Sequence, residues 1–423
     1  MGSEWTEATL GEISNLKNGK GLKNSFYRED GQYPVWGANG QIARTDELLN
    51  EHPVVVIGRV GAYCGSVHAV FEPNWVTDNA IVATPKENNS FRFLYYFLKY
   101  LKPERTSIGS AQPLITQTGL KTLKHSVPPI SDQRAIAHIL GSLDDKIELN
   151  LKMNETLEAM ARAIFKSWFV DFDPVRAKAR LPSPAGRGIE GEGVYALPKE
   201  IADLFPDEFE DSELGEIPKG WEVCPLSDVI DLSGGGTPTT NVKEYWDGDI
   251  PWFSVVDAPL ESDVFVIDTE KHISQLGVDN SSTKILPYGT TIISARGTVG
   301  KCALVGKPMA MNQSCYGITG REERGSIYIY YLIRNLVADL QRSGHGSVFN
   351  TITRNTFKTI LSTDPEGEIT KAFDSFVNPY FQLILKNSHE SNTLTKIRDT
   401  LLPKLISGEL RVPDAEKMLE DVI

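Results

Sequence analysis

The strongest constraint on the fold is an internal repeat, in which three stretches of the first half of the sequence recur in the second half. The offset between the copies grows from 216 to 235 and 237 residues and then holds, which indicates about twenty extra residues near the start of the second copy. Two copies with one long period predict a duplicated domain pair, because solenoid repeats are far shorter. The recurring residues are Trp5, Leu10, Glu12 and Ile13 as Trp221, Leu226, Asp228 and Val229; residues 94–99 as residues 329–334; and Gly109, Ser110, Ile115 and Thr116 as Gly346, Ser347, Ile352 and Thr353.

Each copy follows the same plan, in which a β-rich block precedes a long helix. The first part, about 130 residues, is rich in Gly, Pro and aromatic residues, and residues 54–57 and 290–293 are short runs typical of β-strands. Apolar residues then recur mostly at intervals of three, four or seven, which predicts a helix that buries one face. These positions run from Ile136 to Trp168 in the first copy and from Phe373 to Leu405 in the second.

The two predicted helices are too long for one small domain to bury. A helix of roughly 38 residues extends ~57 Å at 1.5 Å per residue. Two such helices in one chain bury each other most economically as a coiled coil, and the alternative is two separate core helices, one in each domain. Ser131 is expected to cap the first helix, and Pro174 lies just after its end.

These patterns predict an α+β protein in which two β-rich domains with short helices are joined by two long, paired helices. The linker between the copies is rich in Gly and Pro and then acidic, with eight acids and no base from Glu200 to Glu216. Such a stretch is typical of a solvated connector, and a partner-binding segment is the alternative. The expected segments are the first domain at 1–131, the first long helix at 132–170, the linker at 171–216, the second domain at 217–368, the second long helix at 369–408 and a C-terminal tail at 409–423.

Charge and composition narrow the class of protein. The formal net charge of −13 argues, taken alone, against a nucleic-acid partner. Most of the excess lies in the linker and the C-terminal tail, however, and residues 1–130 carry 13 bases and 12 acids. We expect no membrane contact and a cytoplasmic location, because there is no signal-peptide pattern and no apolar run near the roughly 18–20 residues that span a bilayer. Four cysteines without a CxxC pair argue against a disulfide scaffold and a zinc ribbon.

No motif in the sequence predicts catalysis. The nearest match to a phosphate-binding P-loop lacks its first Gly and its final hydroxyl, and no GxGxxG motif opens a βαβ unit. Asp144-Asp145-Lys146 lies in the helical stripe, where a solvated face is the simpler interpretation. Cys64 with His68, and Cys302 with Cys315, are isolated pairs, which are rarely metal ligands. We therefore expect no catalytic and no metal-binding residues, and an unrecognised enzyme is the weaker alternative.

A basic loop in the first copy is the best candidate for phosphate contacts. Lys17, Lys20, Lys23 and Arg28 lie within twelve residues, without an acid among them and interleaved with glycines. In such a loop, backbone amides and ammonium groups can approach a phosphate together. The alternative is a solvated basic turn.

An arginine next to glycine follows a β-type run in both copies. Gly58-Arg59-Val60-Gly61 and Ser294-Ala295-Arg296-Gly297 occupy these places, which we interpret as equivalent, and Lys301 follows Arg296 in the same stretch. An arginine in such a loop can reach guanine O6 and N7 in bidentate geometry, or it can pair with a carboxylate within a hairpin. A weaker group of candidates has amide side chains able to read adenine edges, namely Asn39, Gln41, Asn312 and Gln313.

Several further stretches carry a family resemblance. They are Leu10-Gly11-Glu12-Ile13, residues 33–40, residues 127–130 with Gln133, Ile136 and Ala137, residues 168–175, residues 214–221, Gly236-Thr237-Pro238, Tyr245-Trp246 and residues 248–252. Together with the duplicated plan, they resemble the specificity subunit of type I restriction–modification enzymes over nearly the whole chain. The second copy departs from the pattern, because Asp364-Pro365-Glu366 replaces the Pro-Pro-Ile-x-x-Gln that precedes the first helix.

The resemblance implies both an architecture and a function. It implies two target-recognition domains, each reading one half of a split, asymmetric site on double-stranded DNA, and an antiparallel coiled coil that fixes the spacer. It also implies two modification subunits, which methylate adenine, and two restriction subunits. These partners would bind S-adenosylmethionine, ATP and Mg²⁺, so that this chain binds no cofactor. The alternative is a coiled-coil scaffold that binds proteins instead of DNA. Candidate partner-binding residues on the helices are Ile147, Leu151, Trp168, Phe169, Leu394 and Leu401.

Overall fold

A computed structural model describes residues 5–109, 113–180, 197–259, 263–322, 324–342, 351–365 and 367–419 of the chain. The repeat members Ser110, Gly346 and Ser347, and most of the predicted Gly/Pro-rich linker, lie outside these residues. The chain divides into two compact units, unit 1 with Met1–Ile147 and Asn392–Ile423, and unit 2 with Glu148–Ser391. Each unit therefore contains one β-rich domain and a part of both long helices. No helix in the described ranges is long and apolar enough to cross a membrane.

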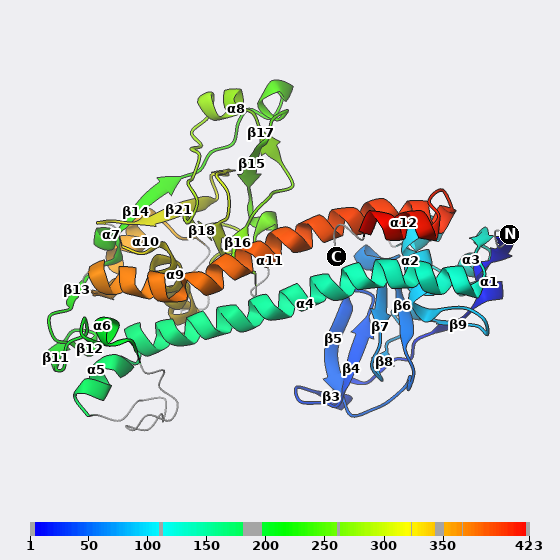
Figure 1. Cartoon of the computed structure of the whole chain (residues 1–423), viewed down its shortest axis with the longest axis horizontal. Helices are drawn as coiled ribbons and strands as arrows, with labels where there is room; N and C mark the ends of the chain where they lie inside the picture. The colour runs from blue at the N-terminus through cyan, green and yellow to red at the C-terminus, as the bar shows by residue number, and fades with distance from the viewer. Residues whose placement is uncertain are drawn as a thin grey trace. The chain divides into compact units, whose positions relative to one another are not determined.

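The two long helices are α4 (Ile130–Phe169) and α11 (Gly367–Ser407), shown in Figure 1. The prediction that Ser131 is the N-cap of the first helix is wrong. The carbonyl of Pro129 already accepts the N–H of Gln133 (3.0 Å), so the helix begins at Ile130, directly after a residue that has no N–H to satisfy. The hydroxyl of Ser131 instead donates to the Asp132 side chain (3.1 Å).

The long helices pack against each other in antiparallel order. In unit 2, Asn150 of α4 donates to Glu390 of α11 (2.8 Å), and Asn387 of α11 donates to Asn154 of α4 (2.9 Å). Residue numbers thus rise along one helix as they fall along the other. The predicted α+β fold with paired helices is confirmed, and the alternative of two helices that each pack only within their own domain is wrong.

The β-rich domain of unit 1 is built on two four-stranded sheets. Its elements are β1 (Thr6–Thr9), α1 (Leu10–Ile13), β2 (Ser14–Asn18), β3 (Tyr27–Arg28), β4 (Tyr33–Gly37), β5 (Gly40–Thr45), β6 (Val54–Gly58), β7 (Val67–Val70), β8 (Trp75–Val76), β9 (Ala80–Pro85), α2 (Phe91–Leu101), α3 (Gln117–Lys121) and β10 (Lys124–Val127). The sheet orders are β2-β9-β6-β7 and β3-β5-β4-β8, and β1 pairs with β10. One apolar core joins α2 to the first sheet, to α4 and to α11, and its members include Ile57, Phe97, Leu140 and Leu401.

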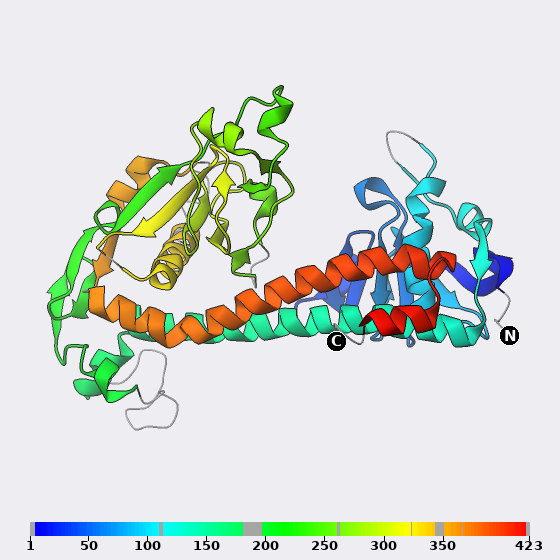
Figure 2. The ribbon, with the colours of Figure 1, turned by 45° about the horizontal axis from the view of Figure 1, so that its top comes forward.

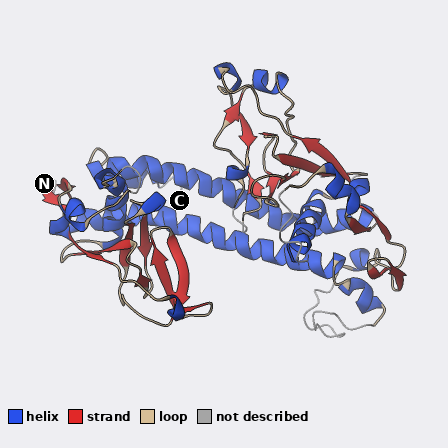
Figure 3. Ribbon diagram, turned by 180° about the vertical axis from the view of Figure 1, so that it is seen from behind, coloured by secondary structure: helices blue, strands red, loops and turns tan. Residues whose placement is uncertain are grey.

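The β-rich domain of unit 2 is also built on two sheets, of five and three strands in the described residues, and its strands are red in Figure 3. Its elements are β13 (Glu222–Pro225), α7 (Leu226–Val229), β14 (Ile230–Gly234), β15 (Ile250–Phe253), β16 (Phe265–Val266), β17 (His272–Ile273), α8 (Gln275–Asp279), β18 (Thr291–Ser294), β19 (Cys302–Val305), β20 (Ala310–Met311), β21 (Cys315–Gly320), α9 (Ser326–Arg342), α10 (Arg354–Thr359) and β22 (Leu361–Asp364). The sheet orders are β14-β21-β18-β19-β16 and β17-β15-β20, and β13 pairs with β22.

The internal repeat is visible element by element. The order β2-β9-β6-β7 corresponds to β14-β21-β18-β19, and the parallel pair β4–β8 corresponds to β15–β20. The recurring threonines cap equivalent short helices, since Thr116 accepts the N–H of Gly119 (3.1 Å) and Thr353 accepts that of Thr356 (3.4 Å). The duplication read from the sequence is therefore a duplication of structure.

The sequence offset predicted that the extra residues of the second copy lie near its start. This prediction is wrong, because they lie in the middle of the copy. Val35 begins the parallel pairing of β4 with β8, and Trp252 begins that of β15 with β20, so these two residues correspond in the two copies. By the same reasoning, the antiparallel pairing of β6 with β9 and of β18 with β21 makes Val55 correspond to Thr291. The added residues thus fall between β15 and β18, in the connections that hold β16 and α8. The offset was measured at only three places in the sequence, so it could not separate these positions.

The acidic segment after the linker is folded and is not a free connector. It contains α6 (Lys199–Ala202), β11 (Phe209–Ser212) and β12 (Gly215–Pro218), with α5 (Asp173–Lys178) shortly before it. Phe205 packs edge-on against Trp168 at 5.3 Å between ring centroids, and the guanidinium of Arg176 lies 5.0 Å from the ring of Phe209. Aromatic residues among the acids therefore anchor this segment to the core of unit 2.

The predicted C-terminal tail contains a helix, α12 (Val412–Leu419). This short red helix lies beside the end of α11 in Figure 2, and its buried Ala415 belongs to the core of unit 1. Leu410 and Val412 pack against the same core. The tail thus adds apolar contacts to the helix pair.

Candidate nucleic-acid interface

The basic loop of the first copy is held in place by its glycine and its backbone. A Cβ atom on Gly19 would overlap the carbonyl oxygen of Thr77, so only glycine allows this close approach. The N–H of Lys20 then donates to Val76 (2.8 Å), and the indole N–H of Trp75 donates to the Lys20 carbonyl (2.7 Å). The fixed backbone leaves the ammonium group of Lys20 exposed, 5.9 Å from the centroid of the Trp75 ring.

Arg59 reaches the same turn from the end of β6. Its guanidinium donates to the carbonyl of Asp78 (3.3 Å), the residue directly after Thr77. Arg59 is half-buried and forms no ion pair within the described part of the chain, which leaves the alternative of a hairpin ion pair without support. The structure therefore brings Arg59 and the basic loop to one turn.

The β4–β5 hairpin ends at this place too. Its two-residue tip is Ala38-Asn39, and the carbonyl of Ala38 accepts a hydrogen bond from the hydroxyl of Ser66 (2.5 Å) in the β6–β7 loop. Asn39 is exposed. We name residues 19–23, 38–39, 59–66 and 77–79 the loop cluster of unit 1, because these four segments meet at one end of the two sheets.

Three other predicted residues of the first copy lie outside or beside the loop cluster. Arg28 and Gln41 line one shallow hollow of about 500 Å³ over β3 and β5, together with the exposed Ile42. The guanidinium of Arg28 donates to Ser25 (2.9 Å) and Tyr27 (3.1 Å) carbonyls. Lys17 is exposed on β2, directly before the loop cluster.

The second copy repeats the backbone of the loop cluster but not its side chains. A Cβ atom on Gly235 would overlap the carbonyl oxygen of Asn312, and the N–H of Gly236 donates to Met311 (2.9 Å). Gly235 and Gly236 thus stand where Gly19 and Lys20 stand in the first copy. The second copy therefore lacks the lysine at this position.

Basic side chains of the second copy gather in the loop between β18 and β19. Arg296 and Lys301 are both exposed there. The hydroxyl of Ser294 closes the loop, because it donates to the Thr298 carbonyl (2.5 Å) and accepts the N–H of Lys301 (2.8 Å). Gly297 has a φ of 77°, which a residue with a side chain adopts only with strain.

The prediction that residues 58–61 and 294–297 occupy equivalent places is confirmed, but the arginines in these two stretches stand one residue apart. Ile115 donates to the Arg59 carbonyl (2.9 Å), whereas its repeat partner Ile352 donates to the carbonyl of Ala295 (2.8 Å). Arg59 therefore corresponds to Ala295, and Arg296 corresponds to Val60. Because successive side chains of extended backbone point to opposite sides, the two arginines project differently from the same framework.

The amide candidates of the second copy shape the turn that follows β20. The side-chain oxygen of Asn312, which is half-buried, accepts the N–H of Ser314 (2.9 Å). Gln313 is exposed, and its side-chain oxygen accepts the hydroxyl of Thr237. Both side-chain oxygens already accept a hydrogen bond, and Gln313 is the more exposed of the two amides.

The candidate partner-binding residues are mostly inside the chain. Trp168 and Phe169 are 2% and 7% exposed in the core of unit 2, and Leu394 and Leu401 are buried in the core of unit 1. Ile147 and Leu151 are half-buried on α4. Buried side chains cannot contact another subunit without rearrangement, so the structure gives the first four a packing role between the helices and the domains.

The residues considered for chemistry have structural roles. Asp144 accepts a hydrogen bond from the Tyr96 hydroxyl (2.6 Å) and pairs with Arg398 (2.6 Å), so it is not a solvated position as predicted. Burial raises the pKa of Cys302 and of Cys315 to about 12, which keeps both thiols protonated at neutral pH. Within the described ranges, no three His, Cys, Asp or Glu side chains come together as metal ligands.

One residue of the loop cluster was missed in the sequence. Tyr63 lies in the β6–β7 loop with 53% of its surface exposed, and its carbonyl accepts the N–H of Ser66 (3.1 Å). An exposed aromatic ring in a basic loop is suited to contact with a sugar or a base. Its place between Gly61 and Gly65 is the signal that could have marked it, since both glycines have positive φ.

Two copies of one loop framework, each with exposed basic and amide side chains and each joined to a shared helix pair, define a duplicated recognition protein. Comparison with known proteins gives the family. A family model described as the type I restriction modification DNA specificity domain matches residues 2–159 and 218–378. The type I restriction enzyme HindI specificity subunit of Haemophilus influenzae is 31% identical over 443 residues, which cover 94% of this chain and 90% of that protein.

Two further comparisons agree. The type I restriction enzyme MjaIX specificity subunit of Methanocaldococcus jannaschii is 30% identical over 340 residues, which cover 78% of this chain and 71% of that protein. The crystal structure of a type I restriction–modification S subunit from M. genitalium has the same fold, with a TM-score of 0.58 at 17% identity and 96% coverage of both chains. This chain belongs to the family of type I restriction–modification specificity subunits. Such subunits are in general non-catalytic and give a restriction–modification complex its DNA sequence specificity.

Proposed function

We propose that this chain selects the target of a type I restriction–modification complex by reading a bipartite, asymmetric DNA site, one half with each β-rich domain. One observation carries the proposal: the two domains share a backbone framework but present different side chains on it. Lys20 corresponds to Gly236, and Arg59 corresponds to Ala295. Two readers of one design with different contact groups are what a site with two unlike halves requires.

Each domain is proposed to combine positioning with base readout. Exposed lysines such as Lys20, Lys23 and Lys301 would neutralise phosphates and fix the register of the domain on the duplex. Arg59, Arg296 and Gln313 would reach base edges, where arginine suits guanine and an amide suits adenine. Because the chain as a whole is acidic, we expect weak DNA binding by the lone subunit and strong binding only by the assembled complex.

The helix pair is proposed to fix the spacer between the half-sites. Antiparallel helices that bury each other form a rod of fixed length, which would hold the two recognition domains at a constant separation. We expect the half-sites to lie about one turn of the DNA helix apart, roughly 34–36 Å between centres. We propose that two modification subunits and two restriction subunits complete the complex. S-adenosylmethionine, ATP and Mg²⁺ would bind to those partners, which would carry out adenine methylation and restriction.

Methylome sequencing of cells that express this chain with its modification subunit tests the proposal. We expect one adenine methylation motif with two defined parts and a constant spacer. Adding one helical turn to both α4 and α11 should lengthen the spacer and leave the half-site bases unchanged. The same insertion in the exposed β11–β12 turn, after Glu213, is the control and should change neither.

The outcome also separates the proposal from a protein-binding scaffold. A scaffold would co-purify with partners but would not direct methylation to a motif. Altered half-site bases with the original spacer would refute the measuring role of the helices.

A further inference from the structure

The junction between each β-rich domain and its long helix contains a polar cluster that includes none of the candidate DNA-binding residues. In unit 1 the side chain of Gln133, the fourth residue of α4, is 2% exposed. It accepts the N–H of Ser90 (3.0 Å) and donates to the Asn89 side chain (3.0 Å) and to the Pro128 carbonyl (2.9 Å). One buried amide thus joins the start of α4 to the residues before α2 and after β10.

Unit 2 has a hydrogen bond at the corresponding position. Thr370 is the fourth residue of α11 and fully buried, and its hydroxyl oxygen accepts the N–H of Gly325 (3.4 Å). Gly325 directly precedes α9, as Ser90 directly precedes α2. In both units, the fourth residue of the long helix therefore accepts a hydrogen bond from the residue that directly precedes α2 or α9. Glutamine has this role in unit 1, and the shorter threonine has it in unit 2.

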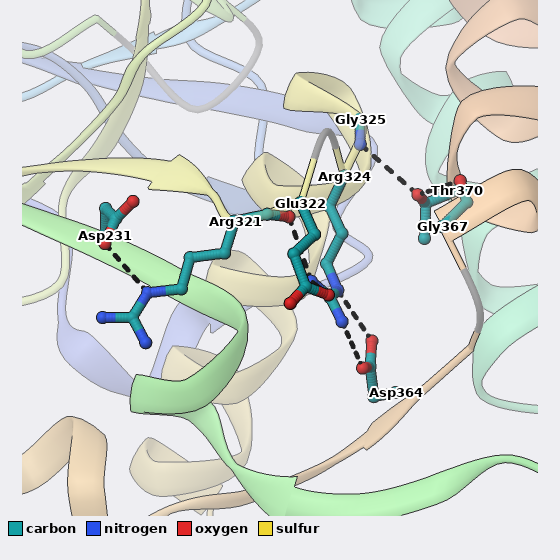
Figure 4. Close-up of polar contacts among 8 residues, drawn as sticks. All are labelled: Asp231, Arg321, Glu322, Arg324, Gly325, Asp364, Gly367 and Thr370. Atoms are coloured by element: carbon teal, nitrogen blue, oxygen red, sulfur yellow. Dashed lines mark hydrogen bonds and ion pairs between the residues drawn. The ribbon is translucent and has the colours of Figure 1, made fainter.

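In unit 2 an ion pair links the end of the strand to the loop before α9, a connection that the short side chain of Thr370 does not make (Figure 4). Arg324 donates through Nε (2.9 Å) and Nη2 (2.5 Å) to the two carboxylate oxygens of Asp364, the last residue of β22. The two side chains are only 9% and 14% exposed. Arg324 stands at the repeat position of Asn89, so the link between the strand and the loop before α9 is kept with different chemistry.

The loop itself is tied further into the domain. Arg321 donates to Asp231 of β14 (2.8 Å), and the Arg324 guanidinium also donates to the Arg321 carbonyl (3.0 Å), as Figure 4 shows. A Cβ atom on Gly325 would overlap the carboxylate of Asp374, which accepts the N–H groups of Ile327 (2.9 Å) and Tyr328 (2.8 Å) at the start of α9. The junction has no room to tilt without breaking these bonds.

We infer that Gln133, and Thr370 with the Arg324–Asp364 pair, are equivalent positioning clamps that fix the direction in which each recognition domain leaves its long helix, and thereby set how strictly the complex measures the spacer. Among the hydrogen bonds and ion pairs of the described residues, those of Gln133, Thr370, Arg324 and Asp364 do not involve a candidate DNA-binding residue. Loss of a clamp should therefore relax the spacer while the half-site bases stay the same. This inference rests on the proposed bipartite recognition.

Three variants test the clamps without leaving a buried charge unpaired. Thr370→Val removes the hydrogen-bond acceptor at almost constant shape, Gln133→Leu removes the amide of unit 1, and the double variant Arg324→Met with Asp364→Leu removes the ion pair as a unit. Thr370→Ser keeps the hydroxyl and should restore wild-type behaviour. Thr400→Val is the matched control, because it removes an exposed hydroxyl from the same helix.

The measurement is the methylome of cells that express each variant with the modification subunit, together with thermal unfolding of the purified chain. For folded clamp variants we expect methylation at sites with a spacer one base pair longer or shorter to rise at least tenfold over wild type, with unchanged half-site bases. If Thr370→Val does not fold, the double variant decides. A folded variant with the wild-type spacer and rate overturns the inference. If wild type itself shows no two-part motif, the proposed function fails instead.

Discussion

Asn154 and Asn387 meet across the helix pair, and the amide nitrogen of Asn387 donates to the side-chain oxygen of Asn154 at 2.9 Å. Both are almost completely buried, and Asn150 is fully buried one turn away. The apolar stripe of each helix is therefore interrupted by a polar layer. Buried polar groups of this kind cost little while they are paired and much when one partner is removed.

We predict that Asn154→Leu and Asn387→Leu each lower the free energy of unfolding by about 1–3 kcal/mol, because each leaves a buried amide without its partner. The double variant should cost clearly less than the sum of the two. Urea denaturation of the purified chain provides the double-mutant cycle. Asn280→Leu, at an exposed position of unit 2, is the control and should change little. Strictly additive losses would show that the two amides do not act as a pair.

We predict that Gly19→Ala weakens DNA binding by the assembled complex at least tenfold, because its Cβ atom overlaps the Thr77 carbonyl and must displace the loop that carries Lys20. Gly21→Ala is the matched control in the same loop. The nearest atoms to its Cβ belong to Asp78 at 3.8 Å, which is an ordinary van der Waals distance, so binding should stay within twofold of wild type. Fluorescence anisotropy with a duplex that contains the methylation motif measures both. Equal losses for the two variants would contradict the close-approach argument.

Substitutions of lysine and of arginine in the loop cluster should affect different properties of DNA binding, namely overall affinity and sequence discrimination. We predict that replacing Lys20 and Lys23 by Ala weakens binding to every sequence. The negative slope of log K against log salt should become shallower by about 0.9 for each phosphate that is no longer neutralised. Arg59→Ala should instead relax the choice at one base pair, with a loss of about 1–3 kcal/mol of discrimination. Titrations at several salt concentrations with specific and scrambled duplexes separate the two effects. If both changes lower all affinities equally, the division of labour is wrong.

Asp374 makes stability depend on pH in an unusual direction. Burial raises its pKa to about 6 from the ordinary value of 3.8. Between about pH 4 and 6, the folded state therefore holds a proton that the unfolded state has released. We predict that the free energy of unfolding falls by roughly 2–3 kcal/mol as the pH rises through this window on account of this group. Asp374→Asn should flatten that part of the profile, and an unchanged slope in the variant would assign it to other groups.

Much of the architecture could be predicted from the sequence because it depends on patterns that repeat. Residues that recur in order, such as Thr116 and Thr353, mark equivalent helix caps. Long apolar stripes through Leu140 and Phe381 require a partner of equal length, and one chain with two such stripes provides it. The existence of the paired helices therefore follows from hydrophobic burial alone.

The site was less predictable because it depends on backbone contacts between distant segments. The sequence predicted that residues 58–61 and 294–297 are equivalent, and the bonds made by Ile115 and Ile352 confirm this register, in which the two arginines stand one residue apart. The folding of the acidic segment depends on Phe205 meeting Trp168, which charge counting cannot detect. Gln133 was noted as part of a motif, but its role as a clamp appears only once Ser90 and Asn89 lie beside it.

Gly19 and Lys20 separate two demands that usually compete for the same residue. The glycine satisfies the fold, and the exposed side chain of its neighbour is free to contact a target, whereas in the second copy Gly236 itself lies too close to Thr283 to carry a side chain. Substitution of Lys20 can then change the chemistry offered to a target without disturbing the scaffold. A protein built this way can change its preference one half at a time, because each innovation is confined to the copy in which it arises.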